Sequence, residues 1–107
     1  KEKISINNQR IKKKDIKKYQ FYINDGDLMI QQKKWNNAIF QYTRALEIFP
    51  NEFDAQYRFA LAHTYKCQST NDGCIKGDSL VSRLILHFPK NKKIQELKKI
   101  IKKQLHD

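Results

Sequence analysis

The segment from Trp35 to Pro50, WNNAIFQYTRALEIFP, has the clearest helical pattern in the chain. Its apolar side chains recur at intervals of three and four residues, which places them on one face of a helix about four turns long. They are Trp35, Ala38, Ile39, Tyr42, Ala45, Leu46 and Phe49. Because Ala38 and Ala45 are small, a second helix can approach this face closely. Pro50 predicts the end of the helix, since proline cannot continue one.

The composition favours a small all-α fold. The chain has 107 residues, of which 39% are hydrophobic, and this is enough for one domain with a modest core. Its content of only three Gly and two Pro indicates long helices joined by few turns. No apolar run reaches the roughly 18–20 residues that a helix needs to cross a bilayer.

The net charge of +11 is concentrated at the two ends of the chain. Residues 1–18 carry a net charge of +6 and residues 90–107 carry +5, whereas residues 19–89 are balanced. Basic ends of this kind can attract anionic lipid, nucleic acid or an acidic protein. However, Lys outnumbers Arg by 18 to 4, and surfaces dedicated to phosphate usually contain more Arg, whose planar group binds phosphate bidentately.

The hydrophobic periodicity divides the chain into a basic N-terminal arm, two helical hairpins and a final helix. We assign the arm to residues 1–13, the hairpins to residues 14–50 and 51–89, and the final helix to residues 91–106. In the first helix, Gly26 lies on the apolar side, where the absence of a side chain permits close contact with a neighbouring helix.

The last two predicted helices have apolar faces that we expect to be buried. In the second helix of the second hairpin, the inward-facing residues are Leu80, Val81, Leu84, Ile85 and Phe88. In the final helix, lysines surround a narrow apolar stripe that consists of Ile94, Leu97, Ile101 and Leu105. We expect this stripe to cover the open edge of the helical stack, although a Lys-rich amphipathic helix can also lie on an anionic membrane.

The two hairpins share one pattern of residues. The first contains Tyr22, Asp25, Gly26, Met29, Ala38, Tyr42 and Pro50, and the second contains Gln56, Phe59, Ala60, His63, Gly77, Val81 and Pro89. This pattern resembles the tetratricopeptide repeat, a helical hairpin of about 34 residues with small residues and a terminal proline at these positions. The two prolines are 39 residues apart here, and the additional residues fall between Cys67 and Cys74, at the turn of the second hairpin.

The resemblance implies a short right-handed superhelix of stacked hairpins that acts as a protein–protein interaction scaffold and not as an enzyme. In this family, the first helices of the hairpins line a concave groove that binds a peptide or protein partner. Carried over to this chain, the groove-facing residues are Asn24, Asp27, Gln31, Tyr57, Arg58, Leu61 and Tyr65. As an alternative, Tyr57, Leu61 and Tyr65 pack against the first helix and serve the core.

The only two cysteines, Cys67 and Cys74, flank the turn signal Asn71-Asp72-Gly73. A turn between antiparallel helix ends can bring two cysteines within the distance of a disulfide. We therefore predict a disulfide and, with it, an exported protein that is periplasmic or membrane-associated. The alternative is a pair of free thiols in a cytosolic protein.

The sequence contains no catalytic or nucleotide-binding motif. Asp25 and Asp27 are two residues apart on a helix and therefore point to different faces, so they do not form an acid–base pair. The histidines His63, His87 and His106 do not have the spacing of metal ligands. We expect no cofactor, no metal site and no small-molecule substrate.

A second hypothesis treats the chain as a basic adaptor that docks on an anionic surface, either membrane lipid or nucleic acid, through its Lys-rich ends. Docking of this kind weakens steeply as the salt concentration rises. Binding in a groove should instead tolerate moderate salt and depend on Asn24, Tyr57 and Arg58.

Overall fold

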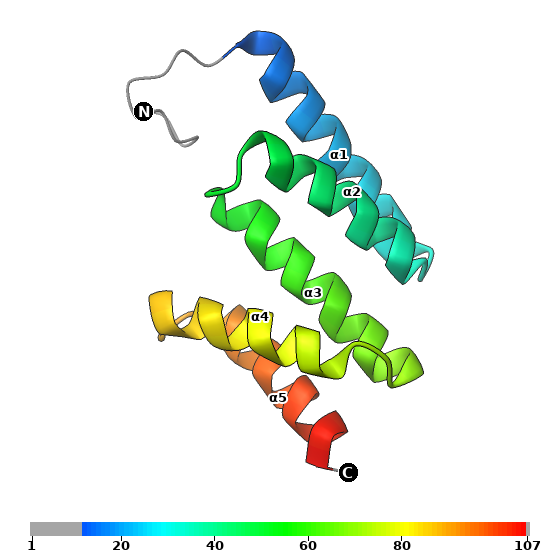
Figure 1. Cartoon of the computed structure of the whole chain (residues 1–107), viewed down its shortest axis with the longest axis vertical. Helices are drawn as coiled ribbons and strands as arrows, with labels where there is room; N and C mark the ends of the chain where they lie inside the picture. Colours follow the sequence, from blue (N-terminus) through cyan, green and yellow to red (C-terminus); the bar gives the residue numbers. More distant parts are fainter. Residues whose placement is uncertain (1–11, 107) are drawn as a thin grey trace. The chain divides into compact units, whose positions relative to one another are not determined.

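The computed structural model describes residues 12–106, and all regular secondary structure within this range is α-helical (Figure 1). The helices are α1 (Lys13–Gln31), α2 (Trp35–Ile48), α3 (Phe53–Thr70), α4 (Cys74–His87) and α5 (Lys92–His106). The predicted all-α class is therefore confirmed. Most of the predicted basic arm, residues 1–11, lies outside the described residues. Within the described range, none of the helices combines the length and the apolar character needed to cross a membrane.

The helices begin and end within a few residues of the predicted positions. α1 starts at Lys13, which the sequence assigned to the arm. α3 continues to Thr70, so it includes residues 68–70, which the sequence assigned to the turn between Cys67 and Cys74. The Thr70 hydroxyl donates to the carbonyl of Lys66 at 2.8 Å, and Asn71, with a φ of 59°, lies just beyond the helix end.

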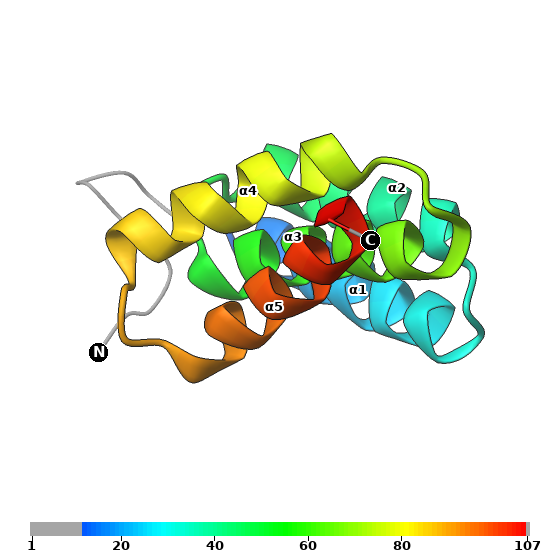
Figure 2. The same ribbon diagram turned by 90° about the horizontal axis from the view of Figure 1, so that it is seen from below.

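The chain divides into two compact units, and the boundary falls within α3, between Phe59 and Ala60. The first unit contains α1, α2 and the beginning of α3, and the second contains the rest of α3, α4 and α5. In the first unit α1 and α2 run antiparallel and side by side (Figure 1), and in the second α4 packs against α5 (Figure 2). The predicted second hairpin, residues 51–89, therefore contains the boundary between the units.

α1 and α2 approach each other closely where Gly26 faces Tyr42. A Cβ atom added to Gly26 would lie 2.3 Å from Cε1 of Tyr42, so this position has no room for a side chain. Tyr42 is completely buried, as are Ala38 and Ala45 on the same face of α2. The small residues of the two helices therefore permit the close packing that the sequence predicts.

Both Phe-Pro pairs end a helix in the same way. The backbone N–H groups of Phe49 and Phe88 each donate to the carbonyl four residues earlier. The side chains of Gln56 and Gln95 then reach back, and each Nε2 donates to the carbonyl of the proline six residues earlier, at 2.9 Å and 2.8 Å. We call these two segments the Phe-Pro joints, residues 49–56 and 88–95. The repeated Phe-Pro sequence therefore forms the same local structure twice.

The apolar face of α5 is buried within the second unit, as predicted. Ile94, Leu97 and Ile101 are at most 2% exposed. The expectation for Leu105 is wrong, because this residue lies in the last turn of α5 and is 42% exposed. Beside this apolar face, Lys98 Nζ donates to Oδ1 of Asp78 in α4 at 2.7 Å, so a charged contact supplements the apolar one.

α4 contributes most of its predicted inward face to the second unit. Val81 and Leu84 are buried, and Leu80 and Ile85 are partly buried. Phe88 is instead 40% exposed, so its predicted inward orientation is wrong. It follows the last helical residue, and its extended φ of −135° takes it off the helical face that the periodicity assumed.

A disulfide joins Cys67 and Cys74, as predicted. Cys67 is buried in α3, and Cys74 is the first residue of α4. Between the two helices, Asn71 and Gly73 have φ values of 59° and 73°, in the left-handed region that Asn and Gly tolerate best. These left-handed conformations explain why the Asn71-Asp72-Gly73 sequence forms a turn.

Replacement of Gly26 by Ala should lower the free energy of unfolding by about 1–3 kcal/mol, because the new methyl group overlaps the buried Tyr42 ring. Gly77→Ala is the matched control. Its Cβ would lie 2.9 Å from the terminal Cδ1 of Ile101, the far end of a flexible side chain, and in ordinary contact with the His63 carbonyl oxygen at 3.6 Å. Both substitutions gain about 1 kcal/mol of helix propensity. Urea unfolding followed by circular dichroism measures the difference, and equal stabilities for the two variants would contradict the assigned packing.

His63 should make the protein less stable in mild acid. Burial, followed by the charges of Lys76 and Lys66, lowers the pKa of His63 from 6.5 to about 4. Between these pH values the unfolded chain binds a proton that the folded chain does not, so stability falls as the pH falls, by up to about 3 kcal/mol. Unfolding at pH 7 and pH 4.5 should therefore show a smaller pH effect in His63→Gln than in the original chain.

The exposed His87 provides the control for this measurement. His87→Gln should change the pH dependence of unfolding less than His63→Gln does. If His63→Gln and His87→Gln changed it equally, burial of His63 would not be the cause.

Candidate functional site

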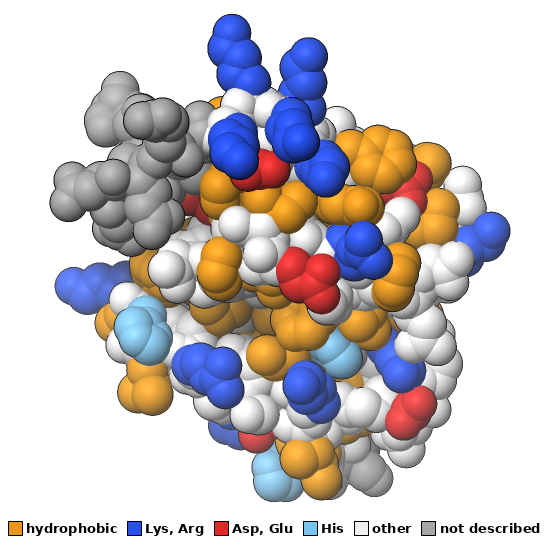
Figure 3. All heavy atoms as spheres, turned by 45° about the horizontal axis from the view of Figure 1, so that its top comes forward, with side chains coloured by type: hydrophobic (Ala, Val, Ile, Leu, Met, Phe, Trp, Pro, Cys, Tyr) orange, Lys and Arg blue, Asp and Glu red, His pale blue; other side chains and the backbone are white. Residues whose placement is uncertain are grey.

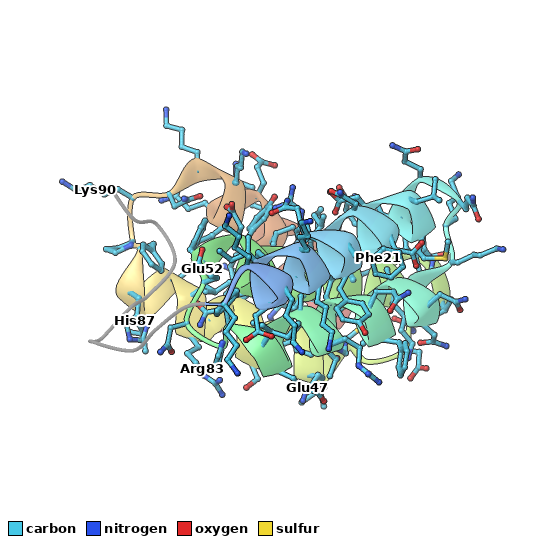
Figure 4. All side chains as sticks on the ribbon, turned by 90° about the horizontal axis from the view of Figure 1, so that it is seen from above. Phe21, Glu47, Glu52, Arg83, His87 and Lys90 are labelled. Carbon is cyan, nitrogen blue, oxygen red and sulfur yellow. A yellow bond between two sulfur atoms is a disulfide. The ribbon has the colours of Figure 1, made fainter. Side chains whose placement is uncertain are left out.

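A hollow of about 250 Å³ lies between α1 and the start of α3 in the first unit. We call it the α1–α3 hollow. It is lined by Tyr19, Gln20, Ile23, Asn24, Asp27, Glu52, Asp54 and Arg58. The α1 residues follow helical spacing and so share one side of that helix. The first Phe-Pro joint brings Glu52, at the start of α3, beside the first turns of α1 (Figure 4).

Asp27 connects the three helices of the first unit. Its Oδ1 atom accepts a hydrogen bond from Nε of Arg58 in α3, with an N···O distance of 2.9 Å. The same oxygen accepts a hydrogen bond from the hydroxyl of Tyr42 in α2. Burial and this bond to a carboxylate both raise the pKa of Tyr42, so the hydroxyl stays protonated and remains a donor. Asp27 and Arg58, which the sequence assigned to a partner, thus bind each other.

Asp25 points to another side of α1, as the spacing predicts. Its Oδ2 atom accepts a hydrogen bond from Nε2 of Gln41 at 2.5 Å. Asp25 therefore contacts α2 beside a second depression of about 330 Å³, and Asp27 faces the α1–α3 hollow. The two carboxylates do not cooperate at one site.

The α1–α3 hollow is locally acidic in a basic chain. Three of its lining residues are acids, namely Asp27, Glu52 and Asp54, and Arg58 is the only base among them. Arg58 is paired with Asp27, and Glu52 and Asp54 are the other two acids of the lining. Within the described residues, Asp54 has no ion pair closer than 4 Å.

Tyr19 forms a buried wall of the same hollow. Its side chain is only 5% exposed, and its hydroxyl makes no hydrogen bond of ordinary geometry. The backbone N–H of Ala55 interacts with the oxygen without reaching that geometry. Burial, followed by the charges of Glu52 and Asp54, raises the pKa of Tyr19 to about 12. The Tyr19 hydroxyl therefore remains protonated near neutral pH.

Four predicted groove residues do not line the hollow. Gln31 is exposed at the end of α1. Tyr57 is partly buried, and its ring stacks on Phe53 with 6.1 Å between centroids. Leu61 and Tyr65 are partly buried residues of α3 in the second unit. The partial burial of these α3 residues is compatible with packing and with contact to a partner.

The predicted groove residues include only three of the eight residues that line the hollow, namely Asn24, Asp27 and Arg58. Among the missed residues, Tyr19 has the apolar ring of a core residue, and Glu52 and Asp54 lie at a helix start, where acids are common. The available signal was the Pro50 turn, which brings the first turn of α3 alongside the start of α1. The combination of two acids after such a turn and a tyrosine near the start of α1 could have indicated the site.

A second surface of the first unit is aromatic. The guanidinium of Arg44 lies 5.5 Å from the centroid of the Tyr22 ring and 5.7 Å from that of Phe40, both within the range of cation–π contacts. Phe21 (Figure 4) and Phe40 are each 58% exposed. Arg44 also forms an exposed ion pair with Glu47, with 3.6 Å between Nε of the arginine and Oε1 of the glutamate.

The described parts of the Lys-rich ends are exposed. Lys12, Lys13 and Lys14 are all exposed, and Figure 3 shows Lys and Arg side chains gathered around the beginning of α1. On α5, Lys92 and Lys93 are among several exposed lysines, while the apolar face of the helix is buried. The ends therefore present charge to solvent with little apolar surface.

Comparison with models of known protein families, with curated proteins and with solved structures finds no match to this chain. The arguments for a function therefore come from the residues of the chain itself.

Replacement of Asp27 by Asn should destabilise the first unit more than the same change at Asp25. The Asp27 variant leaves Arg58 without a counterion and weakens the acceptor for Tyr42, and we expect a loss of about 1–2 kcal/mol after allowance for partial exposure. Asp25→Asn keeps an oxygen acceptor for Gln41 and should change the free energy of unfolding by less than about 0.5 kcal/mol. Urea unfolding of both variants measures the contrast, and a larger loss at Asp25 would refute the role given to Asp27.

Proposed function

We propose that this chain is a protein–protein interaction module that resembles tetratricopeptide-repeat proteins and binds a peptide segment of a partner through the α1–α3 hollow. The observation that carries the proposal is the convergence of Asn24, Asp27 and Arg58 on one concave surface. These residues come from helices that are separated in sequence, and the family resemblance alone had placed them in a groove. A concave surface lined by both polar and apolar groups is the usual form of a binding site.

The duplicated Phe-Pro joints and the close helix contacts support the resemblance. The joints share their backbone and glutamine hydrogen bonds at equivalent positions 39 residues apart. Gly26 and Gly77 each leave room for a side chain of a neighbouring helix. Small residues and a terminal proline at such positions are features of helical hairpin repeats.

The difference in burial between α2 and α3 supports binding by α1 and α3. α2 buries Ala38, Tyr42 and Ala45, so its inner face serves the core. The stripe of α3 that contains Tyr57, Leu61 and Tyr65 at intervals of four residues is only partly buried. Tyr57, the member of this stripe that belongs to the first unit, is the one that we assign to partner binding together with the hollow, because Tyr is common among the residues that dominate binding energies.

A second candidate function is docking on an anionic surface through the Lys-rich ends. The exposed lysines of α1 and α5 favour it, whereas the burial of Ile94, Leu97 and Ile101 leaves little of the α5 apolar face for insertion into lipid. Binding of this kind would rest on charge alone and would weaken steeply with salt.

The two candidates can be separated with one set of variants. Fluorescence anisotropy would measure binding of the full chain to the tightest peptide from a random-peptide selection, and to vesicles containing phosphatidylserine, at several salt concentrations. Asn24→Arg places a large side chain at the hollow and should weaken peptide binding by about tenfold or more. Ser79→Arg, an exposed α4 position with the same change of charge, should change it by less than about twofold.

The vesicle measurement tests the second candidate. Vesicle binding that falls steeply with salt and is unaffected by Asn24→Arg, together with no selectable peptide, would support docking through the ends and contradict the peptide-binding proposal. Peptide binding that Asn24→Arg and Ser79→Arg weaken equally would place the binding surface elsewhere.

A further inference from the structure

We propose that a groove between α1 and α2 binds an acidic amphipathic helix of a partner protein, on the side of α1 that points away from the α1–α3 hollow. We call it the α1–α2 groove. The inference is independent of the proposed function, since it concerns other residues and another face of the first unit.

The α1–α2 groove follows the line along which α1 and α2 run side by side (Figure 1). Its base is a depression of about 330 Å³ that is lined by Asp25, Met29, Asn36, Asn37, Phe40 and Gln41. Successive residues of a helix are about 100° apart, so Tyr22 and Met29 share one side of α1, whereas Asn24 points in nearly the opposite direction from Tyr22. A helix in this groove would therefore not compete with a ligand in the α1–α3 hollow.

Large apolar side chains remain exposed along the rim of the groove. Phe21 of α1 (Figure 4) and Phe40 of α2 are each 58% exposed, and Leu28 of α1 is 44% exposed. Phe21 and Leu28 are seven residues apart and so lie on one stripe of α1. The Phe21 ring also contacts the ring of Tyr22, with 5.4 Å between centroids. Exposed apolar side chains along two antiparallel helices form a surface that can receive the apolar face of a third helix.

Arg44 provides a positive group that is held in position at the groove. Its guanidinium lies 5.5 Å from the centroid of the Tyr22 ring in α1 and 5.7 Å from that of Phe40 in α2, so it bridges the two helices. Its exposed ion pair with Glu47 is made by Nε, so the terminal nitrogens can still donate to another carboxylate. A guanidinium that rests on aromatic rings and keeps these donors is well suited to a bidentate contact with Glu or Asp.

Basic residues lie at both ends of the α1–α2 groove. At one end, Lys18 precedes Tyr22 by one turn of α1, and Tyr22 in turn contacts Arg44. At the other end, Lys33 and Lys34 belong to the turn that joins α1 to α2, next to the depression. All three lysines are exposed. A helix in the groove would therefore meet positive charge at each of its ends.

Acids are fewer than bases around the groove. Among the described residues, two acids lie beside it, namely Asp25, which accepts a hydrogen bond from Gln41, and Glu47, which pairs with Arg44. The bases outnumber them by two, so the rim carries a positive formal charge and complements a helix whose apolar stripe is flanked by Glu or Asp. The same excess disfavours a second copy of this chain, because its own rim is also positive and its net charge is +11.

The test measures binding of the full chain to three synthetic helices by fluorescence anisotropy near physiological salt. Each is an Ala-rich peptide of about 18 residues, long enough to form a helix alone, with one stripe of Leu and Phe. The positions that flank the stripe are Glu in the first peptide, Gln in the second and Lys in the third. We expect the Glu peptide to bind at least about fivefold more tightly than the Gln peptide, and the Lys peptide to bind most weakly.

Two variants with matched controls locate the binding surface. Arg44→Gln and Phe40→Ala should each weaken binding of the Glu peptide by about fivefold or more. Arg83→Gln removes the same charge from an exposed position of α4, and Leu86→Ala shortens an α4 residue that is 79% exposed, so both should change binding by less than about twofold. Because all four residues are exposed, each variant should keep the circular dichroism spectrum of the original chain.

Four results would overturn the inference. Equal binding of the Glu and Gln peptides, or no binding of either, would rule out selection of an acidic helix. Equal losses in Arg44→Gln and Arg83→Gln would indicate general attraction to a basic chain. A dimer in sedimentation equilibrium that Phe40→Ala dissociates would show that a second copy covers the groove. Weaker binding of the Glu peptide in Asn24→Arg would place that peptide in the α1–α3 hollow, whereas unweakened binding supports a separate site.

Discussion

A single carboxylate oxygen, Oδ1 of Asp27, joins the three helices of the first unit. This junction depends on the preceding residue, because the ring of Tyr42 lies against Gly26 and thereby brings its hydroxyl group to Asp27. Any side chain at position 26 would displace the ring and with it one of the two donors. The backbone freedom usually associated with glycine is irrelevant here, since what matters is the absence of volume within a regular helix.

The same junction determines the character of the α1–α3 hollow. Since Asp27 is committed to Tyr42 and Arg58, it holds the guanidinium of Arg58 in place and neutralises it. The other two acids of the lining, Glu52 and Asp54, lie at the start of α3.

The helices and the disulfide could be predicted from the sequence because their signals are local. Apolar periodicity, Pro50 and the Asn71-Asp72-Gly73 turn each act over a few residues. The errors occur where periodicity stops being informative, as at Phe88 and Leu105, which lie at or beyond helix ends and are exposed. The polar residues before Asn71 offered no periodic signal, and α3 therefore extends further than expected.

The site was only partly predictable because it depends on contacts distant in sequence. Asn24, Asp27 and Arg58 were placed by the resemblance to a repeat family, yet nothing in their spacing showed that two of them pair across 31 residues. A carboxylate on a helix looks the same in a sequence whether it meets solvent, a partner or an arginine. Tyr19 shows the converse difficulty, since an aromatic residue on an apolar stripe conceals a polar atom until its neighbours are known.

The Phe-Pro joints are local connectors between a helix and the helix that follows it. Each of their hydrogen bonds spans at most six residues, so a joint requires only its own short segment to form. A tandem duplication of the DNA that encodes one helical hairpin would therefore carry a working connector with it. Insertion or removal of a whole hairpin at a joint would therefore require no new loop.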